Sequence, residues 1–214
     1  MKSACILSLY VVSFLLSCNS DPKTKAKEKT TQSTYNLPLP QGWGKEVFPI
    51  PMNFAPAINY KGHEEIRFTP GWGDSTKADY WSYAFLWCLD SDPNMNDSTV
   101  ESNLRHYYDG LIRSNSQQFH ITNAMMFPTE TSFEKIAPVN GDQQTFTGTI
   151  KMLDYMRQQP QVLNSMVHLK FCSAVNKYMV FYKISPRPVT DSVWIGLNRL
   201  WTDFECGAKV PGLK

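Results

Sequence analysis

The sequence predicts an α+β fold: a mainly antiparallel β-sheet with two amphipathic helices packed on one face. The expected elements run in the order strands, helix, strands, helix, and short connections separate most neighbouring strands. Apolar residues recur at helical spacing in two segments, whereas the other apolar segments are short and rich in β-branched and aromatic residues. A doubly wound parallel sheet would require strands that alternate with helices, so we do not expect one.

Three early segments are expected to be strands. Residues 45–54 have extended character, and Pro49 and Pro51 confine them to a sheet edge because proline cannot donate a backbone hydrogen bond. Residues 63–69 alternate between two sets of side chains, as a half-buried strand does. Residues 80–89 are aromatic and nearly all apolar, which fits a central strand covered on both faces.

The first helix is expected over residues 99–113. Ser98 and Glu101 have the spacing of a capping box, in which a hydroxyl and a carboxylate cap the first turn. The apolar residues at helical spacing are Val100, Leu104, Tyr107, Tyr108, Leu111 and Ile112.

The middle of the chain gives weaker patterns. We interpret residues 118–126 as a strand, residues 131–136 fit no element, and Asn140-Gly141 predicts a turn. After this turn, β-branched and aromatic residues dominate, and we expect a three-stranded antiparallel meander from residues 143–156, 162–174 and 178–184.

The second helix follows the meander. Pro186 and Pro188 end the last strand, Thr190 or Asp191 caps the helix, and Gly207 ends it. Its apolar stripe comprises Val193, Trp194, Leu197, Leu200, Trp201 and Phe204.

The amino terminus has the pattern of an exported protein. Lys2 precedes an uncharged apolar run at residues 4–16, too short for a membrane span of about 20 residues but suited to a signal peptide. The run ends in the sequence LLSC, with leucine three positions before Cys18 and a small residue directly before it. This sequence resembles the lipobox of bacterial lipoproteins.

The resemblance implies that residues 1–17 are a signal peptide and that Cys18 becomes the lipidated first residue, with a diacylglyceryl group and a further fatty acid such as palmitate. Asn19 stands where an aspartate would retain such lipoproteins in the inner membrane, so we expect the outer membrane, on either of its faces. The alternative is an ordinary secretory signal, which would need an A-x-A-like cleavage site that the sequence lacks after the apolar run.

Residues 18–35 are expected to be the lipidated cysteine and a disordered tether. The segment lacks large aliphatic residues, so it cannot bury enough apolar surface to offset its ordering entropy. Its alternating lysines fit a solvated spacer better than a contact with anionic head groups; they are Lys23, Lys25, Lys27 and Lys29.

Residues 36–214 are expected to form a single domain. From Tyr35 onward the chain holds 16 of its 21 Lys and Arg residues and 17 of its 19 Asp and Glu residues. The domain therefore lacks the basic excess that nucleic-acid binding requires, and no nucleic-acid partner is expected.

Cys88, Cys172 and Cys206 remain after the anchor. We weigh one disulfide, with Cys172 and Cys206 as the better partners, against three free thiols, and expect Cys88 to be a buried thiol in an apolar strand. His168 and Cys172 would lie about 13 Å apart along a strand, so they do not form a catalytic dyad.

No motif names a reaction. The histidines are isolated and no metal-binding, serine-hydrolase or nucleotide-binding motif occurs, so we predict no metal, no cofactor and no catalytic residue. His63 and Glu65 share a strand face and could ligate a metal, but we favour a solvated polar face that includes Arg67. As the alternative function we keep a hydrolase whose site assembles from two or three of the residues His63, Glu65, His120, Cys172 or Asp154.

Trp43 and Trp72 are the candidate ligand-binding residues, because each stands between two glycines. Such loops let an indole stand on the surface, where it stacks on a sugar ring or packs on a partner protein. The alternative, which we favour, is a turn whose indole folds back onto the sheet. The remaining tryptophans are expected in the core.

These features predict a membrane-anchored envelope lipoprotein that acts as a binding or accessory module, with a glycan or an envelope protein as ligand. A structural envelope protein without a small ligand is a third interpretation. The layout of signal, lysine-rich tether and α+β domain resembles that of lipoproteins of Bacteroidota. This resemblance of organisation implies no activity.

Overall fold

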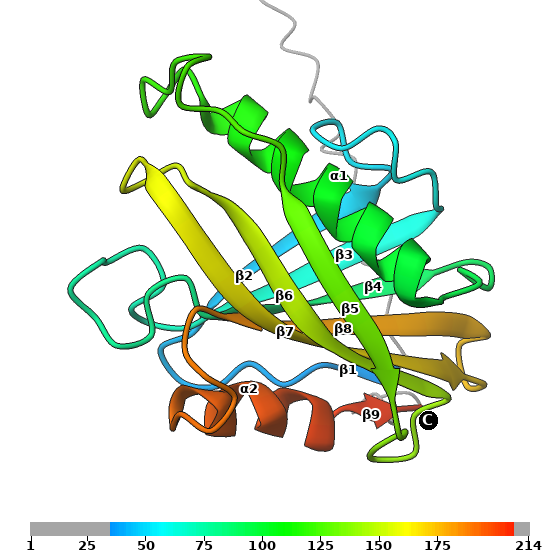
Figure 1. Cartoon of the computed structure of the whole chain (residues 1–214). Helices are drawn as coiled ribbons and strands as arrows, with labels where there is room; N and C mark the ends of the chain where they lie inside the picture. Colours follow the sequence, from blue (N-terminus) through cyan, green and yellow to red (C-terminus); the bar gives the residue numbers. More distant parts are fainter. Residues whose placement is uncertain (1–34, 208–214) are drawn as a thin grey trace, which may run out of the picture. The chain divides into compact units, whose positions relative to one another are not determined.

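Seven antiparallel strands form one sheet in the computed structural model, which describes residues 35–207 (Figure 1). In spatial order they are β2 (Gly44–Ile50), β3 (Gly62–Phe68), β4 (Tyr83–Leu89), β8 (Lys177–Ser185), β7 (Gln159–Cys172), β6 (Gln144–Asp154) and β5 (Glu130–Ile136). Two short strands, β1 (Tyr35–Asn36) and β9 (Glu205–Cys206), pair with each other. The predicted α+β class with a mainly antiparallel sheet is confirmed.

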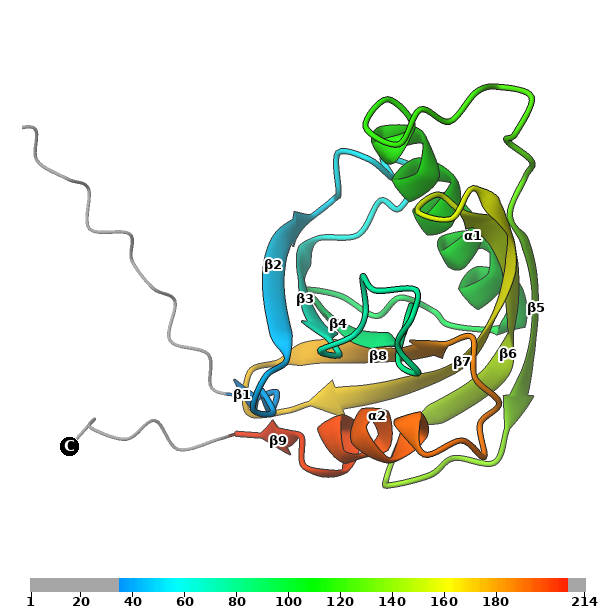
Figure 2. The same cartoon turned by 90° about the vertical axis from the view of Figure 1, so that its left-hand side faces the viewer.

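The two helices lie on opposite faces of the sheet (Figure 2). Helix α1 (Asp97–Asn115) shares a core with Phe85 of β4, whereas α2 (Val193–Thr202) shares a core with Leu86. We name these sides the α1 face and the α2 face. Since successive strand residues point to opposite faces, β4 contributes to both cores. The expectation that both helices pack on one face is therefore wrong.

The predicted places of two strands are confirmed. All seven residues of β4 are buried between β3 and β8, as expected for a central strand covered on both faces. Strand β2, which contains Pro49, lies at the edge of the sheet. The meander is also confirmed, because β6, β7 and β8 are consecutive antiparallel neighbours.

Helix α1 begins earlier than predicted. Its N-cap is Asn96, whose side-chain oxygen accepts a hydrogen bond from the backbone N–H of Thr99 at 3.0 Å. The expected capping box at Ser98 is wrong. The Glu101 carboxylate instead accepts a hydrogen bond from the backbone N–H of Phe133 in β5 at 2.9 Å, so it ties α1 to the sheet.

Two further predictions are corrected, and one segment without a prediction is assigned to an element. Residues 118–126 form turns rather than a strand, and residues 131–136, which had no prediction, belong to β5. Gly207 lies beyond β9 with a φ of 84° and does not end α2. Asp191 does support the start of α2, since its carboxylate accepts a hydrogen bond from the backbone N–H of Val193 at 2.9 Å.

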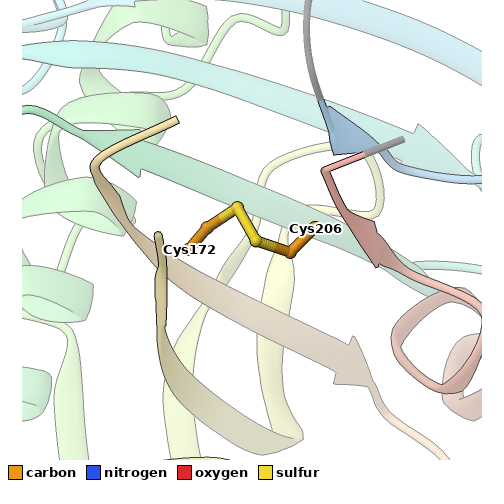
Figure 3. Close-up of a disulfide and its surroundings, with 2 residues drawn as sticks. All are labelled: Cys172 and Cys206. Atoms are coloured by element: carbon orange, nitrogen blue, oxygen red, sulfur yellow. A yellow bond between two sulfur atoms is a disulfide. The ribbon is translucent and has the colours of Figure 1, made fainter. Parts of the chain in front are cut away.

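A disulfide joins Cys172 at the end of β7 to Cys206 in β9 (Figure 3). It ties the segment that follows α2 back onto the sheet and confirms the preferred pairing. Among the described residues, Cys88 is the free thiol, and it is buried as expected. Within residues 35–207, no helix is both long and apolar enough to span a membrane.

The polar row of β3 on the α2 face is buried, not solvated as expected. Arg67 is 2% exposed and donates hydrogen bonds to the carbonyl oxygens of Leu37 and Pro38, each at 2.9 Å. Its guanidinium also donates to Glu65 at 3.0 Å. The segment that starts with β1 thus covers this row, and the arginine satisfies backbone carbonyls that β-pairing leaves open.

Candidate functional site

A pocket of about 420 Å³ opens on the α1 face, between α1 and the β2 edge of the sheet. We call it the α1-face pocket. Its floor comes from β2, β3 and β4, and its walls come from α1, the connections on either side of β3 and the turn after β6. Half of the lining side chains are aromatic: Phe48, Phe54, Phe68, Trp72, Trp81, Tyr83, Tyr107 and Tyr155.

Strand register explains why these side chains meet. Phe68 of β3 pairs directly with Tyr83 of β4, and both side chains line the pocket. Glu46 of β2 pairs with Ile66 of β3, and both also line it. Side chains alternate between the two faces along each strand, and directly paired residues of an antiparallel sheet point to the same face. The aromatic side chains of β2, β3 and β4 that line the pocket therefore lie together on the α1 face.

One end of the pocket is closed by the connection between β2 and β3. Gly110 of α1 lets this connection approach the helix, because a Cβ at that position would stand 2.1 Å from the carbonyl oxygen of Phe54. The Phe54 ring then packs edge-on against Tyr107 at a centroid distance of 5.2 Å. A glycine on α1 is thus a requirement of the pocket wall.

Trp72 lies in the wall among other rings. Its centroid is 4.6 Å from that of Phe68 and 5.9 Å from that of Trp81. Its indole nitrogen Nε1 is shielded from solvent and has no hydrogen-bond partner among residues 35–207. An unpaired buried donor is unfavourable, so Trp72 contributes to the pocket through its ring rather than through this N–H.

Trp81 lines the same wall with a strained backbone. Its side chain is fully buried and its φ is 55°, in the left-handed region that bulky residues avoid. Its backbone N–H donates to the carbonyl oxygen of Trp72 at 3.0 Å, which holds the two tryptophans together. Strain of this kind persists where the surroundings fix it, and it is concentrated at binding sites.

The pocket has a negative electrostatic character. Glu46 is the charged residue in its lining, and none of the described residues that line it is Lys, Arg or His. Burial, together with the charges of Asp154 and Glu46, raises the pKa of Tyr155 to about 12. The wall therefore suits a neutral or cationic ligand better than an anion.

A buried carboxyl lies directly behind this wall. Glu64 is fully buried and accepts hydrogen bonds from Trp87 Nε1 at 2.5 Å and from the Tyr107 hydroxyl at 3.1 Å. Burial raises its pKa to about 7 against the lowering effect of these two donors, and the charge of Glu46 adds to the rise.

The two predicted ligand-binding tryptophans have different places. Trp72 lines the α1-face pocket, whereas Trp43 packs on the α2 face, where its ring would lie 3.1 Å from a Cβ added at Gly196 of α2. Sequence reasoning missed the partners of Trp72 in β2, α1 and the β6–β7 turn. The available signal was the two-residue alternation within each strand, which puts Phe48 on the same face as Glu46 and Phe68 on the same face as Ile66.

The hydrolase candidates do not form a common site. His63 and Glu65 lie on the α2 face beside Tyr35, where Tyr35 donates to Glu65 at 2.6 Å. Asp154 accepts hydrogen bonds from Tyr80, and His120 is exposed in a turn. Cys172 is in the disulfide, so it cannot act as a nucleophile. Among the described residues, no three His, Cys, Asp or Glu side chains gather as metal ligands.

A second buried polar group, which the sequence did not indicate, lies on the α2 face. The Nδ1 atom of His168 lies 2.7 Å from the Asp142 carboxylate, which also accepts hydrogen bonds from Trp201 and Thr145. Burial lowers the pKa of His168 despite Asp142, and it lowers that of Lys183 to about 8. This group packs between α2 and the sheet and does not line the pocket.

No protein-family model matches the chain, and no curated protein is similar to it at a significant level. The function must therefore be argued from the α1-face pocket.

Proposed function

We propose that this protein is an envelope lipoprotein whose domain binds a small, mainly apolar molecule in the α1-face pocket. The observation that carries the proposal is the aromatic lining of a cavity of about 420 Å³, which falls in the size range of small-molecule sites.

The lining favours an apolar molecule over the glycan that the sequence suggested. Sugars need many hydrogen-bonding partners, whereas the polar side chains in this lining are few: Glu46, Asn53, Asn115 and the tyrosine hydroxyls. Apolar burial at about 25 cal/mol per Å² provides most of the affinity in such a site. A ligand with an apolar body and one or two polar atoms fits best.

The cellular location rests on two further observations. The lipobox-like sequence at Cys18 lies outside the described residues and remains a prediction. The Cys172–Cys206 disulfide supports an oxidising compartment, since cytosolic proteins rarely keep such bonds. Together they support a location of the domain in the cell envelope, beside a membrane.

The test uses N-phenyl-1-naphthylamine, a neutral apolar dye that brightens when it leaves water. We expect saturable binding with a Kd of about 10 to 100 µM, from the usual efficiency of ligands of this size. Trp72→Ala should weaken binding at least tenfold, because it removes the ring at the centre of the wall.

Trp43→Ala is the matched control, since Trp43 has the same sequence context but lies on the α2 face. A second variant, Leu111→Trp, fills the pocket from α1 and leaves the aromatic wall intact, so it should also abolish binding if Trp72→Ala proves unstable. Absence of saturable dye binding, or equal loss in Trp43→Ala, would overturn the proposal.

A further inference from the structure

The charge of the α1-face pocket points to a class of ligand. Glu46 is exposed at the mouth, on the open edge strand β2, and it points to the α1 face with Ile66 and Phe85. None of the described lining residues carries a positive charge. A ligand that brought an anionic group to this mouth would meet an unbalanced carboxylate, whereas a cation would neutralise it.

Two aromatic rings flank Glu46 on the floor. Phe48 follows it two residues later on the same face of β2, and Phe68 lies two residues beyond its partner Ile66 on β3. Ring faces attract cations, and quaternary ammonium groups are the ligands that aromatic sites typically recognise in this way. An ammonium group beside Glu46 would therefore contact the carboxylate and the rings together.

The charge of Glu46 also reaches the carboxyl behind the wall. Glu64 lies under the pocket, bonded to the Tyr107 hydroxyl, and the pKa values of Glu64 and Tyr155 both respond to the charge of Glu46. The charge of Glu46 is therefore felt in the wall as well as at the mouth. It acts on any charged group that a ligand brings with it.

We propose that the ligand of the α1-face pocket is an amphipathic organic cation, whose apolar body fills the aromatic cavity and whose alkylated ammonium group lies beside Glu46, Phe48 and Phe68. This inference rests on the proposed function, because it requires that the pocket binds a small molecule. The aromatic cavity supplies affinity, and Glu46 supplies the preference for positive charge.

The experiment compares three molecules with the same eight-carbon chain: octyltrimethylammonium, 1-octanol and octanoate. Each is titrated at pH 7 against the protein saturated with N-phenyl-1-naphthylamine, and the concentration that displaces half of the dye is measured. We expect octyltrimethylammonium to act at about tenfold lower concentration than octanol, and octanoate at a higher concentration than octanol. Added salt should narrow these differences.

The Glu46→Gln variant removes the negative charge at the pocket mouth and keeps a side chain of nearly the same size. It should bring octyltrimethylammonium and octanoate within about twofold of octanol, when all three are titrated against the same variant. Glu134→Gln, an equally exposed change on the distant edge strand β5, is the matched control and should preserve the tenfold preference.

The outcomes distinguish the two proposals. If the dye binds and all three molecules displace it at equal concentration, or if Glu46→Gln leaves the preference intact, the inference of a cationic ligand is overturned and the apolar pocket stands. If the dye itself does not bind, the proposed function fails, and this inference fails with it.

Discussion

The hydroxyl of Tyr107 donates a hydrogen bond of 3.1 Å to the buried carboxyl of Glu64, while the ring of Tyr107 lines the α1-face pocket. One side chain thus joins the pocket to a titratable group in the core. Glu64 is fully buried, and burial raises its pKa to about 7. The ionisation of this carboxyl is therefore linked to the stability of the wall around the pocket.

The first prediction concerns pH. A carboxyl whose pKa is higher in the folded than in the unfolded state stabilises the fold when protonated, so its contribution is lost as pH rises from about 4.5 to about 7. A rise of this size corresponds to about 3 kcal/mol in the free energy of unfolding. Glu64→Gln, which mimics the protonated carboxyl, should remove the loss.

The measurement is urea unfolding of both proteins between pH 4.5 and pH 8. His168 has a lowered pKa and acts in the opposite sense, because its neutral form is the stable one in the fold, so the stability difference between the two proteins is the informative quantity. A difference that stays constant across this range would contradict a raised pKa at Glu64.

The second prediction concerns Gly110. A Cβ at this position would stand 2.1 Å from the Phe54 carbonyl oxygen, so Gly110→Ala should push the β2–β3 connection away from α1. We expect a loss of about 1 to 3 kcal/mol, as for other overpacked sites, even though alanine favours the helix itself. Thermal unfolding and dye binding should both weaken. Gly73→Ala, which meets no atom within 4 Å, is the matched control.

The third prediction concerns the disulfide. Cys172 and Cys206 are separated by 34 residues, and opening a loop of this length lowers the free energy of unfolding by about 3 to 4 kcal/mol in the chain-entropy description. Cys206→Ser should show this loss without reductant, and dithiothreitol should then change it no further. The Cys88→Ala variant, which keeps the bond, should remain sensitive to dithiothreitol.

The fourth prediction concerns the anchor. If Cys18 carries fatty acids as the lipobox-like sequence implies, Cys18→Ala should move the protein from the membrane pellet to the soluble fraction. Each buried CH₂ contributes about 0.8 kcal/mol, so two or more chains hold a protein firmly and their loss releases it. The comparison is a variant in which Lys23, Lys25, Lys27 and Lys29 are replaced with serine, which should leave the pellet fraction unchanged. Retention of Cys18→Ala in the pellet would rule out a lipid anchor at this residue.

The sequence predicted correctly those elements that depend on residues close together in the chain. Prolines in 45–54 placed β2 at an edge, the apolar run of 80–89 placed β4 at the centre, and helical spacing located both helices. The first turn of α1 was predicted less well, because Glu101 is used by the distant Phe133 rather than by the helix. Sequence spacing shows that Glu101 could cap the helix, but it does not show that a residue distant in the chain uses the same carboxylate.

The two Gly-Trp-Gly segments separate what sequence decides from what tertiary structure decides. The backbone N–H groups of Trp43 and Trp72 each donate to a carbonyl three residues earlier at 3.1 Å, so the turn that the sequence predicts forms in both. The indoles nevertheless lie on opposite faces, Trp43 against α2 and Trp72 in the pocket. A turn fixes only the local backbone, whereas the face is set by which strand pairs with which.

By itself, then, the sequence determined the α+β class, the antiparallel meander and the edge and centre of the sheet, because residue alternation and proline chemistry act over a few residues. Only the tertiary structure decided that the helices cover opposite faces, that Arg67 is buried, and that aromatic residues from Phe48 to Tyr155 surround one cavity. These features depend on contacts between segments far apart in the chain, for which a single sequence carries no periodic signal.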